Sequence, residues 1–359
     1  MTFFMRSLIL ITLKLLFFIT YLLIFTQRNY TENDIMYEEE GNFDDNQTGM
    51  FLIFMTIVIK NIVDFTEIAN ELKNDVSIFC LIHTSPKYKE SRAIHLKNTW
   101  LKRCNDYLFV STENDQTLPS IKGFRRDGYQ FSNARMRKGL TYVYEKFGDK
   151  YDWIFKADDD TYAIMENIRM FVINRDPSEG HYYGFKLKIK DYYGHKIKYM
   201  SGGGYLISKG ALKKLVTVAF KNPKICSPTP NIPDDVQIGR CFSNINITAM
   251  DSRDIYDRHV FLPSSFSEFG SLIESTHWNG FQKRSFYDLP KGMSALGNFP
   301  MSFHYAIGDM QYGLEYLLYH AEVAGRTSRI IQKTSSGNEL NTEHALNMIK
   351  MYGKSNFKY

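Results

Sequence analysis

The pattern of apolar and polar residues divides the chain near residue 64. Residues 5–25 are almost uninterrupted in apolar side chains and are long enough to cross a bilayer. Arg6 lies at the start of this run, acidic residues follow it, and no small-residue cleavage site ends it. We therefore expect a cytoplasmic tail at 1–7 and a retained signal anchor at 8–26, with a cleaved signal peptide as the alternative.

Two further segments precede the region of regular structure. Residues 27–49 are polar and acidic and predict a disordered stem, which we extend to residue 63. Residues 50–59 within it are apolar but too few to span a bilayer. Glycosylation sequons, which matter only in a lumenal chain, begin at Asn29, Asn46 and Asn246.

From residue 64 onward, short apolar runs alternate with segments of helical period. This alternation predicts a mostly parallel sheet covered by helices, in a single α/β domain over residues 64–325. A polar tail at 326–359 follows, with a helix expected around 338–351. The predicted strands are 76–82, 107–110 and 151–157, and the predicted helices are 64–73, 88–103, 133–147, 164–174 and 209–220.

The strand at 151–157 runs into three consecutive carboxylates, Asp158, Asp159 and Asp160. Open α/β sheets bind ligands at the carboxyl ends of their strands, so the triplet falls where a ligand site is expected. Adjacent carboxylates repel one another, and a cation among them removes that repulsion. Oxygen ligands favour a hard divalent ion such as Mg²⁺ or Mn²⁺. The alternative is a solvated acidic cap on the following helix.

Composition narrows the functional classes. The 359 residues are 44% apolar and 15% aromatic, which is ample for a large core. The net charge is only +5, and no long basic tract is interleaved with aromatic residues, so we expect no nucleic-acid partner.

The four cysteines lack the close spacing of a zinc site. An even number in a lumenal domain suggests two disulfides. Cys80 with Cys104 and Cys226 with Cys241 is the local pairing, and the other two connectivities stay open.

Seven short blocks occur in the order found in one family. Three of them are the acidic triplet with its flanking residues, a Ser-Gly-Gly-Gly-Tyr block and a Ser-Phe-His-Tyr block. Together the blocks resemble the core 1 β1,3-galactosyltransferases, relatives of fringe, over about residues 65–320. In chain order the blocks are 80–86, 97–105, 155–162, 199–205, 234–241, 251–254 and 302–305.

The resemblance implies a type II Golgi membrane protein whose lumenal catalytic domain has a Rossmann-like GT-A fold. It implies transfer of galactose from UDP-galactose to GalNAc-α-Ser/Thr of a glycoprotein acceptor, in β1,3 linkage and with inversion. The implied cofactor is Mn²⁺, with Mg²⁺ as the alternative. A fringe-like transferase with another donor sugar and a non-catalytic chaperone of a transferase are the competing hypotheses, and a homodimer stays open.

The resemblance also assigns roles to individual residues. Asp158, Asp160 and His304 match the metal ligands, and a divalent ion would stabilise the charge that develops on the leaving diphosphate. Asp235, with Asp234 as second choice, matches the acidic pair expected to take the proton of the acceptor hydroxyl. Without the family, these two acids are more typical of a helix N-terminus, where acidic side chains favour the helix dipole.

The remaining expected contacts concern the two sugars. Trp278 is expected to stack on the acceptor, with a core tryptophan as the alternative. The chain departs from the family on this side, because Ala295-Leu296 replace a cysteine pair, the glycine block is one residue shorter, and residues 276–290 hold fewer aromatics. The nucleotide-sugar is expected to contact Thr84, Arg126, Asp127, Arg135, Asp159 and a turn containing Gly202 and Gly203, which a plain strand-to-helix turn would explain equally well.

Overall fold

We analysed a computed structural model of the chain, which describes residues 65–190, 194, 196–270, 276–290, 292–321 and 342–358. All of these residues belong to one compact unit, Lys60–Tyr359. The expected tail, anchor and stem at 1–63 lie outside the described residues. Within the described ranges, no helix is both long enough and apolar enough to cross a bilayer.

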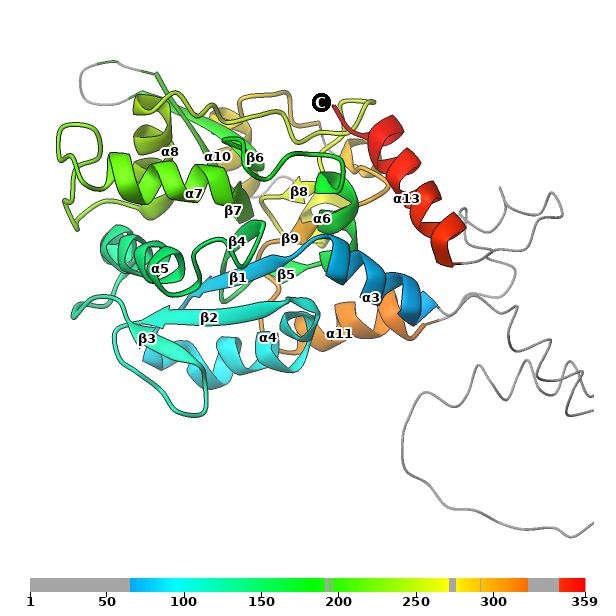
Figure 1. Cartoon of the computed structure of the whole chain (residues 1–359), viewed down its shortest axis with the longest axis horizontal. Coiled ribbons are helices and arrows are strands. Elements are labelled where there is room, and N and C mark those ends of the chain that lie inside the picture. The colour runs from blue at the N-terminus through cyan, green and yellow to red at the C-terminus, as the bar shows by residue number, and fades with distance from the viewer. Residues whose placement is uncertain are drawn as a thin grey trace, which may run out of the picture. The chain divides into compact units, whose positions relative to one another are not determined.

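The described part of the domain is built on a six-stranded sheet (Figure 1). Its strands β3, β2, β1 and β4 are parallel to one another. At the other end of the sheet, β7 is antiparallel to β4, and β6 is antiparallel to β7. This parallel-rich α/β sheet fits the expected GT-A-like fold. In spatial order the strands are β3 (Ser120–Lys122), β2 (Asp106–Ser111), β1 (Ile78–His83), β4 (Trp153–Asp158), β7 (Lys196–Ser208) and β6 (Tyr182–Lys190).

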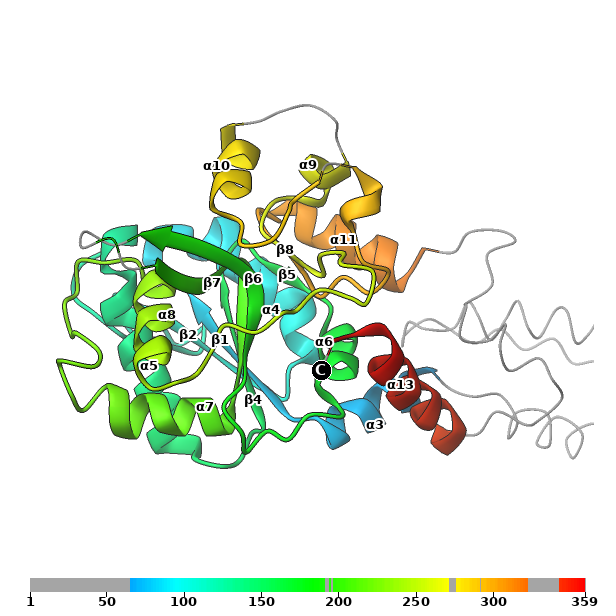
Figure 2. The ribbon, with the colours of Figure 1, turned by 90° about the horizontal axis from the view of Figure 1, so that it is seen from above.

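Helices cover both faces of this sheet (Figures 1 and 2). Successive residues of β1 enter two different cores, which explains why the strand is continuously apolar rather than alternating. One core includes Cys80 and Ile82, and the other includes Phe79 and Leu81. The first is covered by α3 (Phe65–Asp75), α4 (Ile94–Asn98), α6 (Met165–Val172) and α11 (Asp309–Tyr319). The second is covered by α5 (Ser132–Phe147), α7 (Lys209–Lys214), the π-helical turn η5 (Leu215–Ala219) and α8 (Asp234–Asn244).

A small second sheet lies beyond the carboxyl end of β4. It pairs β5 (Tyr162–Ala163) with β9 (Ser302–Phe303), and β9 with β8 (Phe261–Leu262). Two short helices follow β8 in the chain, α9 (Phe266–Gly270) and α10 (Thr276–Arg284), and α10 packs against β6 (Figure 2). Since β5 follows the acidic triplet directly, this sheet brings the chain around residue 303 beside the triplet.

The two disulfides have the local pairing. Cys80 is bonded to Cys104, with 6.1 Å between their Cα atoms, and Cys226 is bonded to Cys241, with 4.8 Å. The segment expected as a tail contains α13 (Thr342–Asn356), which packs on α3 and α6 (Figure 2). Ile349 in this helix and Phe357 after it are buried in the core.

Two expectations about local structure were wrong. The helix predicted at 88–103 is broken into η1 (Pro86–Tyr88), a π-helical turn η2 (Lys89–Ala93), α4 and η3 (Trp100–Arg103). The break after α4 falls at Thr99, whose hydroxyl donates to the carbonyl of His95, and such local side-chain bonds compete with the helix.

The glycine block is not a turn between a strand and a helix. It lies inside β7, where the pairing with β6 jumps from Ser201 to Tyr205. The three glycines between them therefore form a bulge, and Gly202 and Gly204 have φ of 84° and 94°, which side chains rarely tolerate. The short strand β3 lies in the segment between the predicted strand at 107–110 and the predicted helix at 133–147, for which no element was predicted.

Candidate active site

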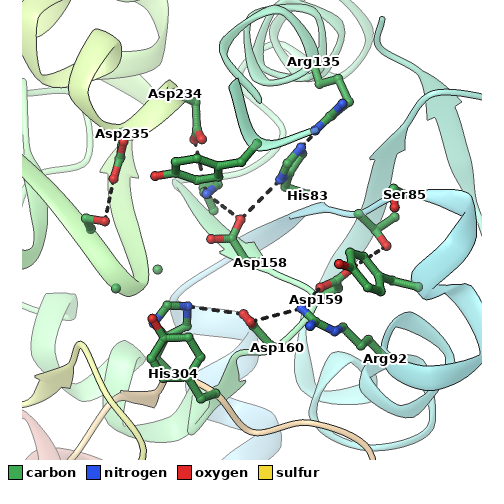
Figure 3. Close-up of a pocket in the computed structure, with 18 of the residues that line it drawn as sticks. His83, Ser85, Arg92, Arg135, Asp158, Asp159, Asp160, Asp234, Asp235 and His304 are labelled. Atoms are coloured by element: carbon green, nitrogen blue, oxygen red, sulfur yellow. Dashed lines mark hydrogen bonds and ion pairs between the residues drawn. The ribbon is translucent and has the colours of Figure 1, made fainter. Parts of the chain in front are cut away.

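A cleft of about 510 Å³ opens at the carboxyl ends of β1 and β4. Its lining includes the whole acidic triplet, His304, Asp234 and Asp235, together with Thr84, Asp127, Arg135 and Gly202. Parallel strands that lie side by side end at the same edge, so the segments after β1 and β4 necessarily meet there. Figure 3 shows the acidic triplet, His304, Asp234, Asp235 and Arg135 around the cleft.

Asp160 and His304 face each other across this edge. Tyr162 of β5 pairs with Phe303 of β9, and the amide of Ala306 donates to the carbonyl of Asp160 at 2.8 Å. The second sheet therefore holds the two side chains together, and Nε2 of His304 lies 3.3 Å from Oδ1 of Asp160 (Figure 3). Burial disfavours the charged imidazole, but the carboxylate of Asp160 raises the pKa of His304 above its usual value.

The Asp160–His304 pair fits a divalent ion. Nδ1 of His304 lies 3.0 Å from the carbonyl of Pro263, and its N–H can donate there, which orients Nε2 toward the carboxylate. Two neighbouring ligands about 2.1 Å from an octahedral ion lie about 3.0 Å apart, close to the observed 3.3 Å. Among the described residues, however, no three His, Cys, Asp or Glu side chains gather closely enough to enclose an ion.

Asp158, the third expected ligand, has its carboxylate engaged by residues other than Asp160 and His304. Its Oδ1 accepts from Nζ of Lys156 at 2.7 Å and lies 3.5 Å from Nδ1 of His83. Nε of Arg135 donates to Nε2 of His83 at 2.6 Å, so the ring proton of a neutral His83 faces Asp158. Burial alone would raise the pKa of Asp158, but Lys156 and His83 hold it well below its usual value.

Asp159 lies in the same cleft, where two residues hold its carboxylate. Thr84 Oγ1 donates to its Oδ2 at 2.7 Å, and Nη1 of Arg92 lies 3.3 Å from its Oδ1. The same Arg92 nitrogen lies 3.2 Å from Oδ2 of Asp160. Burial and the neighbouring charge of Asp160 raise the pKa of Asp159 to about 7.

Asp234 and Asp235 open α8 on the opposite wall of the cleft (Figure 3). Both are buried, and Asp234 lies 3.2 Å from the ammonium of Lys156. Asp235 instead accepts a 2.5 Å hydrogen bond from the hydroxyl of Ser201. Burial and the charge of Asp234 raise the pKa of Asp235 to about 6, so its carboxylate is a stronger proton acceptor than that of an ordinary aspartate.

Of the other residues expected to contact a ligand, some line the cleft and others do not. Arg135 is buried and donates to the carbonyls of Arg126 and Gly128, so it supports the loop that carries Asp127. The side chain of Arg126 itself lies over the ring of Phe131 rather than among the residues that line the cleft. A side chain at Gly203 would collide with Leu262 and Ser302, so this glycine serves packing. Trp278 lies in α10, and its side chain is outside the described part of the structure.

Several residues of the cleft were not found from the sequence. Lys156 is the only lysine in an otherwise apolar run of β4, and this sequence signal could have identified it. Its ammonium bridges Asp158 and Asp234. Burial would lower the pKa of Lys156, but these two carboxylates raise it well above its usual value. Arg92 and Ser201 gave no such signal, because their partners come from distant segments.

Comparison with known proteins supports one class of enzyme. The sequence model of the Fringe-like family matches residues 73–272. Glycoprotein-N-acetylgalactosamine 3-beta-galactosyltransferase 1 of Xenopus laevis is 34% identical over 72% of this chain and 70% of its own length. Human beta-1,3-glucosyltransferase is 25% identical over 56% of this chain and 40% of its own length. Radical fringe of Xenopus laevis, a beta-1,3-N-acetylglucosaminyltransferase, is 26% identical over 51% of this chain and 59% of its own length.

The α/β fold and these relatives define the protein as a β1,3-glycosyltransferase. The chain belongs to the Fringe-like family, and its match to the Xenopus galactosyltransferase confirms the resemblance to the core 1 β1,3-galactosyltransferases.

Proposed function

We propose that the protein transfers galactose from UDP-galactose, in β1,3 linkage and with inversion, to GalNAc α-linked to Ser or Thr of glycoproteins. The proposal rests on two sets of side chains that lie on opposite walls of one cleft, in a chain that is 34% identical to a galactosyltransferase. On one wall Asp160 faces His304, and on the other lies the buried carboxylate of Asp235.

In the proposed reaction, Asp160 and His304 would hold Mn²⁺, or Mg²⁺ as the alternative. When bound, the ion supplies positive charge that stabilises the diphosphate as it leaves. Asp158, whose carboxylate is paired with Lys156 and lies beside His83, lines the same cleft. Thr84 and Arg92 fix the carboxylate of Asp159 on the side of the nucleotide.

Asp235 acts as the general base. The acceptor oxygen forms a bond to the anomeric carbon of galactose while the bond from that carbon to the phosphate oxygen breaks, and its electron pair leaves with UDP. The proton of the attacking hydroxyl passes to the carboxylate of Asp235, which the hydroxyl of Ser201 holds in orientation. Arg284 and Phe281 of α10 line the same cleft, and with Trp278 they are proposed to face the acceptor.

The cellular location that we propose for the enzyme rests on the sequence of its first segment. Residues 8–26 would anchor the chain in the Golgi membrane with the catalytic domain in the lumen, where both disulfides would be stable. The test is extraction of the full chain from cell membranes by alkaline carbonate, which releases peripheral proteins but leaves spanning ones in the pellet.

The activity is tested by incubating the purified chain with Mn²⁺, a GalNAc-bearing glycopeptide and one UDP-sugar at a time. We expect the mass of one hexose to be added from UDP-galactose, and a linkage-specific β1,3-galactosidase to remove it. The relatives make UDP-glucose and UDP-N-acetylglucosamine the necessary comparison arms. Transfer from either of these at a rate above that from UDP-galactose would overturn the choice of donor.

A further inference from the structure

Arg92 is a cation in direct contact with the proposed metal site. Its Nη1 lies 3.2 Å from Oδ2 of Asp160 and 3.3 Å from Oδ1 of Asp159, so one guanidinium joins two carboxylates of the triplet. Oδ1 of the same Asp160 faces His304 (Figure 3). Asp160 therefore presents one oxygen to the imidazole and the other to the guanidinium.

The fold holds Arg92 in this place. It lies in the π-helical turn η2, which follows β1 closely, and β1 is the parallel neighbour of β4, the strand that ends in the triplet. Such single π-turns occur often at functional sites. The guanidinium carbon also lies 4.1 Å from the ring centre of Tyr88, and the ammonium of Lys87 lies 4.5 Å from the same centre. All three side chains line the cleft.

We propose that Arg92 couples metal binding to donor binding, an inference that rests on the metal-dependent function proposed above. A guanidinium stays charged at any relevant pH. A divalent ion between Asp160 and His304 would share the carboxylate of Asp160 with this cation, and the two positive charges repel each other. Without a nucleotide, the charge of Arg92 therefore weakens binding of the metal ion.

A nucleoside diphosphate reverses this relation. Its phosphate oxygens carry several negative charges, and they accept hydrogen bonds from guanidinium groups with high affinity. With the diphosphate in the cleft, Arg92 and the ion both face negative charge, and their mutual repulsion is offset. Metal and donor then favour each other's binding, and by linkage the effect is equal in both directions. The chain thereby favours the metal–donor pair over the metal alone.

The test measures the dissociation constant of Mn²⁺ for the purified full chain by calorimetry, once without nucleotide and once with saturating UDP. In Arg92→Gln we expect Mn²⁺ alone to bind more tightly and UDP to bind more weakly. The coupling factor between the two ligands should fall by about tenfold, within the usual range of such couplings. Arg92→Lys keeps the charge and should retain most of the coupling, whereas loss of a structural contact would affect both variants alike.

Lys89→Gln is the matched control. Lys89 lies in the same turn, but its ammonium pairs with Asp115 at 2.6 Å and does not line the cleft. Its removal should leave the affinity for Mn²⁺ and the coupling unchanged. If the unaltered chain shows coupling that Arg92→Gln retains in full, the role of Arg92 is refuted and the proposed function stands. If the unaltered chain binds no Mn²⁺ even with UDP, the metal-dependent function itself fails, and the role of Arg92 fails with it.

Discussion

The ring of Tyr305 lies against the imidazole of His304, with the ring centres 3.9 Å apart and their planes inclined by 24°. Tyr305 has a φ of 55°, a left-handed conformation that costs a non-glycine residue about 1–3 kcal/mol and is typical of functional sites. The stacked ring limits rotation of the imidazole, while the carbonyl of Pro263 fixes its Nδ1. Together these contacts orient Nε2 toward Asp160.

We therefore expect Tyr305 to be a positioning residue for His304. Tyr305→Phe keeps the stacked ring and should bind Mn²⁺, in the presence of UDP, as the unaltered chain does. Tyr305→Asn tolerates the left-handed backbone but removes the ring, and should weaken Mn²⁺ binding by about tenfold, as loss of a supporting contact does at metal sites. Calorimetry gives the affinities, and a thermal melt of each variant shows whether the fold is kept. Equal affinities for the two variants would contradict this role.

Asp160→Ala and His304→Ala should each lower the rate of sugar transfer by at least about a hundredfold, since the charge on the leaving diphosphate is then poorly stabilised. The melting temperature should stay within a few degrees, because neither side chain belongs to the apolar core. His95→Ala is the control, since His95 contacts Tyr312 on α11 and does not line the cleft. A near-normal rate in His304→Ala would exclude it as a ligand.

Lys156→Met should destabilise the fold. The change leaves the buried carboxylate of Asp234 and the partly exposed carboxylate of Asp158 without their common cation, and breaking a buried pair such as that of Lys156 with Asp234 costs about 3–5 kcal/mol. Lys209→Met removes a partly exposed pair with Asp152 and should cost less than about 1 kcal/mol. Urea denaturation of both variants, with the disulfides intact, compares the two losses. A loss in Lys156→Met no larger than that in Lys209→Met would show that the buried pair contributes little.

The fold was predictable wherever the sequence pattern is local. The apolar run at 76–82 and the helical period at 133–147 mark β1 and α5 within two residues at each end. The antiparallel strands β6 and β7 were missed, although residues 186–190 and 196–199 alternate between lysine and apolar side chains, the usual pattern of a half-buried strand. The small second sheet was not predicted either, because each of its strands has only two residues and forms through tertiary contacts.

The site shows the same division. The acidic triplet follows a clear buried strand, so its place at the sheet edge could be predicted from the residues alone. His304 could not, because only the pairing of β5 with β9 brings it to Asp160, and the family resemblance supplied it instead. Arg92, Lys156 and Ser201 act on the acids through contacts between distant segments, which periodicity does not report.

The dependence of transfer on pH should report the state of Asp235. A general base must be ionised to accept a proton, and burial with the charge of Asp234 raises the pKa of Asp235 above the usual value of about 3.9. Activity should therefore fall as the pH is lowered through this raised pKa, at a higher pH than an ordinary aspartate would give. Asp235→Asn should lose turnover at every pH while still binding UDP.

Ser201→Ala provides the sharper measurement. The hydroxyl of Ser201 donates to the carboxylate of Asp235 at 2.5 Å, and this bond favours the ionised form and so lowers its pKa. Without the hydroxyl, the carboxylate is harder to ionise, and the acidic limb of kcat/KM should move to higher pH. The profile is recorded with saturating Mn²⁺, so that titration of the metal ligands does not contribute. If the limb stayed in place or moved to lower pH, the base would have to be sought elsewhere, with Asp234 and its partner Lys156 as the next pair to test.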